Sequence, residues 1–309
     1  MVFKKLQMIT LFILLPSAVT AEIYQWRDAQ GRQHFSDRVP EQQEGNDPRR
    51  VELRPFQQRE RLLINELHSE IELSSADRDR MQQGIRHIFQ LYTQRFGLDI
   101  HGQVEVNLHL FSSRAEYQQW VFERIGEATR STGIFLTQSN EVGVWDWGTE
   151  TQIVDTILHE ASHVILHQLA PNTPIWLHEG LAQYFQTIRP DGERLRIEPI
   201  AEALLRIRQW IADDQLISVR HYLNIPQEQW QAMAHNRNAI PYTLAWGLVY
   251  FMMSRPVGEQ TIRRILHDLE KSGLRPTLDS INDRYPGGIA SLEYDFFRWA
   301  QEEVPPHWH

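Results

Sequence analysis

The periodicity of hydrophobic and polar positions differs between the two halves of this chain. Between residues 22 and 40 they alternate one by one on either side of Gly31, which predicts a β-hairpin. The same alternation over residues 103–111 predicts a strand. Residues 133–137 and 141–147 alternate around a short polar turn, so we expect a second hairpin there.

The later part of the chain follows a helical period instead. Residues 76–96 carry apolar positions three and four apart behind Ser75, which we expect to be the N-cap, and residues 113–125 follow the same rule. Beyond residue 150 nearly all patterns are helical, and the apolar run around Ala245–Met253 has the composition of a buried helix. Strands that precede helices in this way favour an α+β fold over a wound α/β sheet.

The first 21 residues have the pattern of an export signal. Two lysines precede a short apolar run that Pro16 interrupts, and Val19 and Ala21 fit a cleavage site. No later stretch is long and apolar enough for a membrane helix, so we expect no membrane span after cleavage. The chain then divides into a hairpin module over 22–40, a polar linker over 41–60 and a main domain over 61–309.

Composition narrows the chemistry that this chain can perform. The 309 residues include no cysteine, which excludes thiol catalysis, disulfides and cysteine–zinc sites. The formal charge of −9 argues against nucleic acid as a partner, because such proteins present basic faces. A metal site would therefore have to use histidine and carboxylate side chains.

One segment places such side chains at a productive spacing. His159, Glu160 and His163 form an H-E-x-x-H motif inside a strongly helical pattern, which Thr149 and Gln152 open as a capping box. Residues four apart lie on the same helix face, so both histidines can reach one zinc ion. Glu160 lies beside that face, where a carboxylate can take a proton from a zinc-bound water.

A third ligand follows sixteen residues after the second histidine. Thr173 as N-cap and Pro174 as first helical residue predict a new helix, and Glu179 falls in its second turn. A helix–loop–helix return of this length can bring Glu179 beside His159 and His163. Two histidines and one glutamate, with the fourth position open, make a catalytic zinc set.

Together, H-E-A-S-H and the later P-I-W-L-H-E-G-L-A-Q-Y make the chain resemble the gluzincin branch of zinc metallopeptidases, the peptidase MA-like proteins. The resemblance implies a zincin-like fold and Zn²⁺ held by His159, His163 and Glu179. It also implies that the 133–147 hairpin lines the substrate cleft. A tyrosine from a later helix often donates to the oxyanion in this family, which suggests Tyr242; a packing role in an apolar helix is the equal alternative.

The chain departs from the family pattern after the third ligand. Several gluzincins place an aspartate one turn later to orient a zinc-bound histidine, and Gln183 stands there in this chain. Asp155, one turn before His159, is an alternative candidate for this orienting role, although it can equally be a surface charge. We expect His178 to be a rim or packing residue, and His307 and His309 to be frayed at the chain end.

The hairpin module resembles a small N-terminal module of many Gram-negative envelope proteins. The matching positions are the aromatic residues Tyr24, Trp26 and Phe35 with Asp28 and Gly31. That module has no established activity, so the resemblance implies a periplasmic or secreted location in a Gram-negative cell. An envelope partner that binds residues 22–40 is a further expectation.

These observations favour an exported zinc peptidase that hydrolyses peptide or protein substrates in the cell envelope, with Glu160 as general base. The alternative is a non-catalytic periplasmic scaffold on a peptidase-like fold, which would have no need of Glu160. Hydrolysis of a non-peptide amide by the same site is a third hypothesis, and fold alone cannot select the substrate.

Overall fold

The computed structural model describes residues 23–27, 33–36 and 49–51, and residues 61–309 except 193, 235–239 and 273–277. The chain separates into two compact units, Met1–Arg59 and Glu60–His309. The predicted signal segment, residues 1–21, lies outside the described residues.

The first unit contains a small antiparallel sheet in the order β2-β1-β3. The hairpin predicted for residues 22–40 is present as β1 (Ile23–Arg27) and β2 (Gln33–Ser36). A third strand, β3 (Arg49–Val51), pairs with the other side of β1 and lies within the predicted linker. The third strand adds backbone pairing to a hairpin that would be only marginally stable in water on its own.

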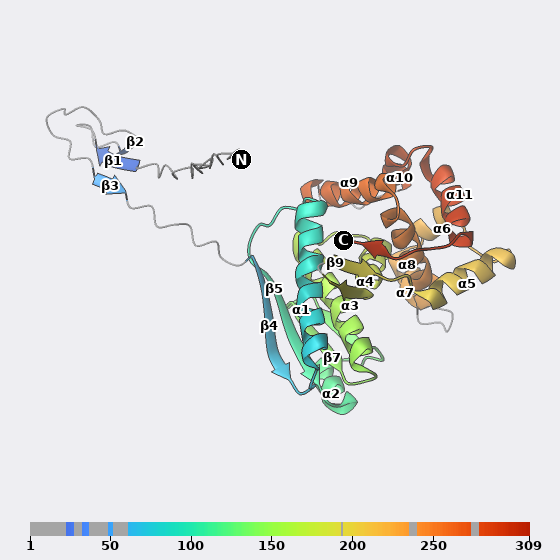
Figure 1. Cartoon of the computed structure of the whole chain (residues 1–309), viewed down its shortest axis with the longest axis horizontal. Helices are drawn as coiled ribbons and strands as arrows, with labels where there is room; N and C mark the ends of the chain where they lie inside the picture. Colours follow the sequence, from blue (N-terminus) through green and yellow to red (C-terminus); the bar gives the residue numbers. More distant parts are fainter. Residues whose placement is uncertain are drawn as a thin grey trace, which may run out of the picture. The chain divides into compact units, whose positions relative to one another are not determined.

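A four-stranded sheet in the order β4-β5-β7-β6 organises the first half of the second unit (Figure 1). Strands β4 (Leu62–Ser69), β5 (Val104–Phe111) and β7 (Glu141–Trp145) run parallel, and β6 (Gly133–Leu136) pairs antiparallel with β7 at one edge. The β6–β7 pair is the hairpin that the sequence predicts. The position of β6 leaves its outer side unpaired among the described strands.

Helices cover both faces of this sheet. Figure 1 shows α1 (Ser75–Gln90) alongside α3 (Glu150–Leu169), and both pack against the same face of the sheet. Helix α2 (Arg114–Ile125) covers the other face. The serine that caps α1 is Ser74 rather than the predicted Ser75, because its hydroxyl accepts from the Asp77 backbone N–H. A π-helical turn, η1 (Leu91–Arg95), continues α1.

The remainder of the unit is mainly helical, as the pattern predicts. After α3 the helices are α4 (Ile175–Phe185), α5 (Ala201–Ala212), α6 (Val219–Leu223), α7 (Gln227–Ala234), α8 (Ile240–Met253), α9 (Pro256–Ser272), α10 (Leu278–Arg284) and α11 (Gly288–Gln301). The chain is therefore α+β, with its strands concentrated in the first half. Within the described parts, no helix combines the length and apolar composition that a bilayer crossing requires.

A second small sheet, absent from the sequence prediction, joins the middle of the chain to its end. Its strands are β8 (Ile188–Asp191), β9 (Arg194–Ile197) and β10 (His307–Trp308), in the order β10-β9-β8. The expectation of a frayed end is therefore wrong. The Tyr184 hydroxyl lies 2.9 Å from His307 Nδ1 and 3.1 Å from His309 Nε2, which fixes both imidazoles.

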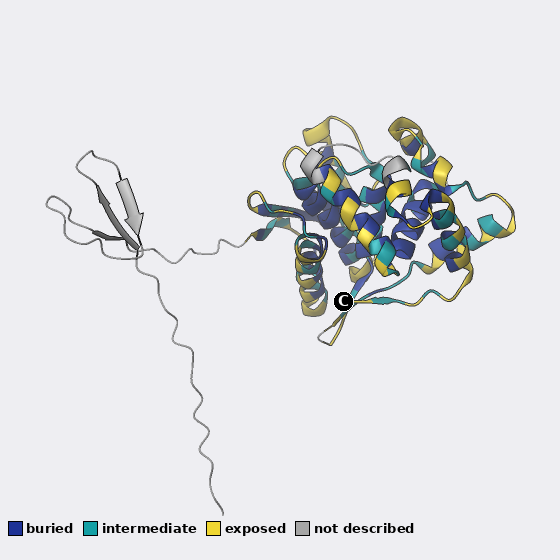
Figure 2. Cartoon of the chain, turned by 90° about the horizontal axis from the view of Figure 1, so that it is seen from above, coloured by how far each residue is buried: buried dark blue, intermediate teal, exposed yellow. Residues whose placement is uncertain are grey.

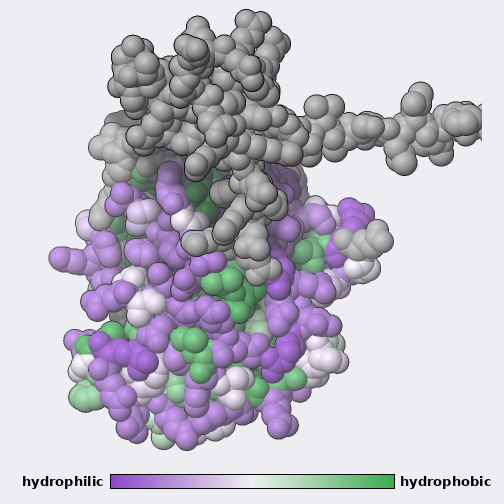
Figure 3. Space-filling model, turned by 90° about the vertical axis from the view of Figure 1, so that its left-hand side faces the viewer, coloured by the Kyte–Doolittle hydropathy of each residue, from purple (hydrophilic) through white to green (hydrophobic). Residues whose placement is uncertain are grey.

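The core of the second unit is continuous through both halves. Figure 2 shows the buried positions gathered on the inner sides of the helices and the exposed ones on the outside. A separate small cluster under α2 contains Phe111, Tyr117, Trp120, Val121 and Leu136. The face drawn in Figure 3 is mostly hydrophilic, with hydrophobic side chains in small separate groups.

Candidate metal centre

Two consecutive helices position the predicted ligands. Thr149 and Gln152 form the predicted capping box at the start of α3, so the helix that carries His159 and His163 has a fixed beginning. Helix α4 has Pro174 rather than Thr173 as its N-cap. The Thr173 hydroxyl instead donates to the Ala170 carbonyl at 2.7 Å and closes the turn between the helices.

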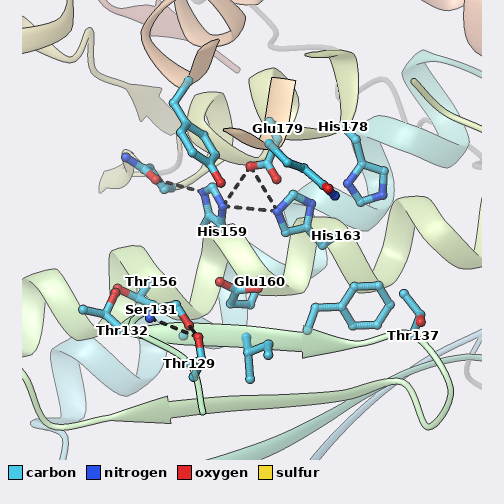
Figure 4. A pocket seen from close by; sticks show the side chains of 16 residues that line it. Thr129, Ser131, Thr132, Thr137, Thr156, His159, Glu160, His163, His178 and Glu179 are labelled. Carbon is cyan, nitrogen blue, oxygen red and sulfur yellow. Dashed lines mark hydrogen bonds and ion pairs between the residues drawn. The ribbon is translucent and has the colours of Figure 1, made fainter. Parts of the chain in front are cut away.

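The three predicted ligand side chains converge at one point (Figure 4). The Nε2 atoms of His159 and His163 lie 3.2 Å apart. Each of them lies 3.5 Å from Oε2 of Glu179. The helix–loop–helix return thus brings Glu179 back beside both histidines, as the spacing predicts.

This triangle has the size that a tetrahedral zinc site needs. Zinc binds imidazole nitrogen and carboxylate oxygen at about 2.0–2.2 Å, so neighbouring ligands of a tetrahedron lie about 3.4 Å apart. The observed separations of 3.2 and 3.5 Å match that value. Oε2 of Glu179 is also buried and has no hydrogen-bond partner among the described atoms. A buried carboxylate oxygen facing two imidazole nitrogens fits a divalent cation.

The residue that orients His159 is Gln186, which the sequence reasoning missed. Gln186 Oε1 lies 3.1 Å from His159 Nδ1, and because an amide oxygen only accepts, the proton sits on Nδ1. The lone pair of the neutral ring is then on Nε2, toward the other ligands. Gln186 stands seven residues after Glu179, two helical turns later on the same face, and that spacing was the available signal.

Neither residue suggested for that orienting role performs it. Gln183 donates its amide N–H to the Tyr242 carbonyl at 3.1 Å. Asp155 pairs with two arginines, Arg80 and Arg189, and the Arg189 Nη1–Asp155 Oδ1 distance is 2.9 Å. The Gln183 amide and the Asp155 carboxylate are thus engaged by other partners, although Asp155 lies one helical turn before His159.

His163 has a stacked ring beside it, whereas His159 has a hydrogen-bond partner on Nδ1. The His163 ring lies 4.5 Å from that of His178 with an interplanar angle of 13°, and its buried Nδ1 has no hydrogen-bond partner among the described atoms. His178 therefore has the expected packing role, and the ring it packs against is that of His163. Burial lowers the pKa of His178 to about 3, so this imidazole is neutral at neutral pH and brings no charge that opposes a cation.

The two carboxylates of the site have opposite electrostatic surroundings. Burial opposes ionisation of Glu179, but the imidazoles of His163 and His159 outweigh it and hold its pKa well below the usual range. Burial raises the pKa of Glu160, which is 8% exposed. A carboxylate with a raised pKa is a better proton acceptor in catalysis, whereas one with a lowered pKa stays anionic as a ligand.

Glu160 occupies space that a glycine leaves open. A Cβ atom at Gly133 of β6 would lie 2.6 Å from Thr156 Cγ2 and 3.0 Å from Glu160 Cγ. Glycine is therefore the residue that lets the edge strand approach α3 closely enough to form one wall around Glu160. Figure 4 shows Glu160 between this strand and the three converging side chains.

Tyr242 comes to the same site from α8. Helix α8 packs tightly on α4, because a Cβ atom at Gly180 would lie 2.5 Å from the Ala245 carbonyl oxygen. Tyr242 lines the cleft and packs against Trp230, with ring centroids 4.9 Å apart. Burial, with Glu179 and Glu160 nearby, raises the pKa of Tyr242, so its hydroxyl remains a proton donor.

All of these groups line one cleft of about 800 Å³. Its walls are α3, α4, β6, the start of α8 and the segment before β6. Apart from the metal-centre residues, the lining is mostly neutral and polar, with hydroxyls of Thr129, Ser131, Thr132 and Thr156 at one end (Figure 4).

Comparison with protein families adds two matches. Residues 153–272 match a family described as a protein of unknown function (DUF1570). This match contains both histidines, both glutamates, Gln186 and Tyr242. Residues 10–61 match a family described as a domain of unknown function (DUF4124). No curated protein matches the chain.

Proposed function

We propose that this protein is a zinc-dependent peptidase of the gluzincin type, with a zincin-like fold over residues 61–309. The observation that carries the proposal is the triangle of His159, His163 and Glu179 with Glu160 beside it. Three ligands with an adjacent carboxylate of raised pKa are the parts that metal-assisted hydrolysis of an amide requires.

Each residue has a role in this proposal. His159, His163 and Glu179 would hold the metal, which when bound supplies a Lewis acid for the water and for the scissile carbonyl. Glu160 takes the proton of the attacking water and delivers it to the leaving amine. The Tyr242 hydroxyl, kept protonated by its surroundings, donates a hydrogen bond to the developing oxyanion.

The edge strand supplies a way to hold a peptide. The outer side of β6 is unpaired among the described strands, and Gly133, Ile134 and Phe135 line the cleft. An extended peptide can add to such an edge through main-chain hydrogen bonds. This mode favours a peptide over a small non-peptide amide as substrate.

We further propose that the protein acts outside the cytoplasm of a Gram-negative cell on envelope peptides or proteins, and not on nucleic acid. Residues 1–21 carry the pattern of an export signal, and residues 22–40 suit an envelope partner. Detection of the processed protein in a periplasmic fraction would test this location.

The decisive experiment pairs metal analysis with cleavage of a peptide library. The Glu160→Gln variant should bind zinc in the wild-type ratio and lose hydrolysis by at least about a thousandfold. Glu179→Ala should lower the zinc content, and Glu123→Gln, a change of an exposed carboxylate on α2, should alter neither property. Full activity of Glu160→Gln would reject the mechanism. Zinc binding by the wild type without any cleavage would favour the scaffold alternative.

A further inference from the structure

Strand β6 lies between two hollows. One is the cleft of about 800 Å³ that contains the metal centre. The other is a pocket of about 360 Å³ lined by β6, by the turn that follows it and by the end of α2. Ile134, Phe135 and Thr137 line both hollows, so the two lie on either side of one short strand.

Alternation along β6 assigns each hollow to one face of the sheet. Gly133 lies against Glu160, and the Phe135 ring lies 5.5 Å from that of His167, so these positions face α3. Ile134 and Leu136 belong to the cluster under α2. Successive strand residues point to opposite faces, which places the second pocket on the α2 side.

The second pocket offers apolar surface and no free charge. Ile125, 48% exposed, lines it with Ile134 and Leu136. Its two charged residues satisfy each other, because Arg124 Nε donates to Glu141 Oε2 at 3.0 Å. Burial would raise the pKa of Glu141, but hydrogen bonds from Arg124 and Ser139 outweigh it and lower that pKa to about 2. An uncharged, apolar group therefore fits this pocket better than a charged one.

We propose that this pocket is a specificity subsite that takes an apolar substrate side chain two or three residues from the cleaved bond. The inference rests on the proposed function and extends it to substrate preference. A peptide paired with β6 continues the pleat of the sheet, so its neighbouring side chains enter the two hollows in turn. Glu160 lies at Gly133 and the pocket lies around Leu136, three residues or about 10 Å along the strand.

Cleavage of a peptide library by the wild type and three variants tests the subsite. The wild type should prefer apolar residues at one position, two or three residues from the bond and on one side of it. Ile125→Gln should reduce this preference, as a ratio of kcat/KM values, by about tenfold. Gln138→Trp, which fills the pocket mouth, should shift the preference to small residues. Phe122→Gln, a 59% exposed position on α2 outside the pocket, is the matched control.

A binding measurement separates failure of the subsite from failure of the proposed function. Zinc-loaded Glu160→Gln protein is used to select binders from a displayed library of extended peptides, with and without Ile125→Gln. Enrichment of apolar residues at one position that Ile125→Gln removes would support the subsite even if the wild type cleaves nothing. The subsite is wrong if no peptide is enriched, or if Ile125→Gln and Gln138→Trp leave both profiles unchanged.

Discussion

A single amide, that of Gln186, determines which nitrogen of His159 carries the proton. Its oxygen holds Nδ1–H and leaves the Nε2 lone pair for a metal. Partners of this kind set the orientation and the basicity of a ligating imidazole. A neutral amide raises the basicity of the imidazole less than the carboxylate that often occupies this position.

Replacement of Gln186 by leucine should therefore lower zinc affinity by about 10–100-fold, because the His159 ring loses its acceptor. Competition with a chromophoric chelator measures the change. Gln183→Leu is the matched control, since the Gln183 side chain bonds to the Tyr242 backbone instead. Equal losses in the two variants would contradict the assignment of Gln186.

Gly133 allows a second prediction at the residue scale. In Gly133→Ala the new methyl would meet Thr156 and Glu160, so the proposed general base must move. We expect kcat to fall by about 10–100-fold with zinc content unchanged, because small displacements of a catalytic group are costly. Gly102→Ala is the control, since nothing lies within 4 Å of a Cβ atom there. An unaltered kcat would show that this contact does not position Glu160.

Site residues were predictable to the extent that they depend on local spacing. His159 and His163 share a helix face by rule, and the return of Glu179 needs only a short turn between two helices. The location of Gln186 depends on where α4 ends and how β8 begins. Arg80, which lies far away in the sequence, contacts both places because it donates to the Gln186 and Ile188 carbonyls. The stacking of His178 on His163 depends on the crossing of α3 and α4, which the sequence does not specify.

At the scale of elements, one arginine joins α1, α3 and the start of β8. Arg80 of α1 is 5% exposed and donates from Nε to the Ile188 carbonyl at 2.8 Å. It also pairs with Asp155 of α3 and donates from Nη2 to the Gln186 carbonyl at 3.3 Å. Helix α1 is thereby tied to α3 and to the start of β8.

Asp155→Asn should therefore destabilise the fold by about 2–4 kcal/mol, because it leaves a buried guanidinium without its counter-charge. Urea denaturation of the metal-free protein measures this free energy of unfolding. Glu202→Gln breaks an exposed i,i+4 pair with Arg206 and should cost less than about 0.5 kcal/mol. If the two variants lost similar stability, Arg80 would not be a structural tie.

The elements themselves were predictable where they are long and periodic. The 103–111 strand, the β6–β7 hairpin and the helices from α1 to α4 follow local patterns, and their observed bounds lie close to the expected ones. Strand β4 was missed although it has eight residues. Strands β8, β9 and β10 were missed because they are short, and β8 contains Pro190. The pairing of His307 with Ile197 joins residues more than a hundred positions apart, and no local pattern encodes it.

At the scale of the whole molecule, the end of the chain is held by buried imidazoles. His307 stacks on Tyr250 with ring centroids 4.1 Å apart, and the rings of His87 and His309 lie 5.4 Å apart. Burial, with Arg95 nearby, lowers the pKa of His87 and that of His307 to about 4. In the folded protein His87 and His307 stay neutral down to about pH 4. In the unfolded chain they become protonated near pH 6.5.

The unfolded state therefore binds more protons between pH 6.5 and pH 4, and stability falls as the pH falls through that range. Between pH 7 and pH 5 the wild type should lose about 1 kcal/mol more than His87→Phe, after allowance for partial exposure. This corresponds to about 2–4 °C in Tm by scanning calorimetry. The exposed control His221→Gln should follow the wild type. Parallel pH profiles for wild type and His87→Phe would refute the assignment.

The open side of β6 also bears on the state of association of the protein. An unpaired strand edge is a template for any extended chain, including a second copy of the same strand. Strand β6 has four residues and begins with a glycine, so a β6–β6 pair could form only a few hydrogen bonds. The brevity of the strand thus limits self-association through this edge.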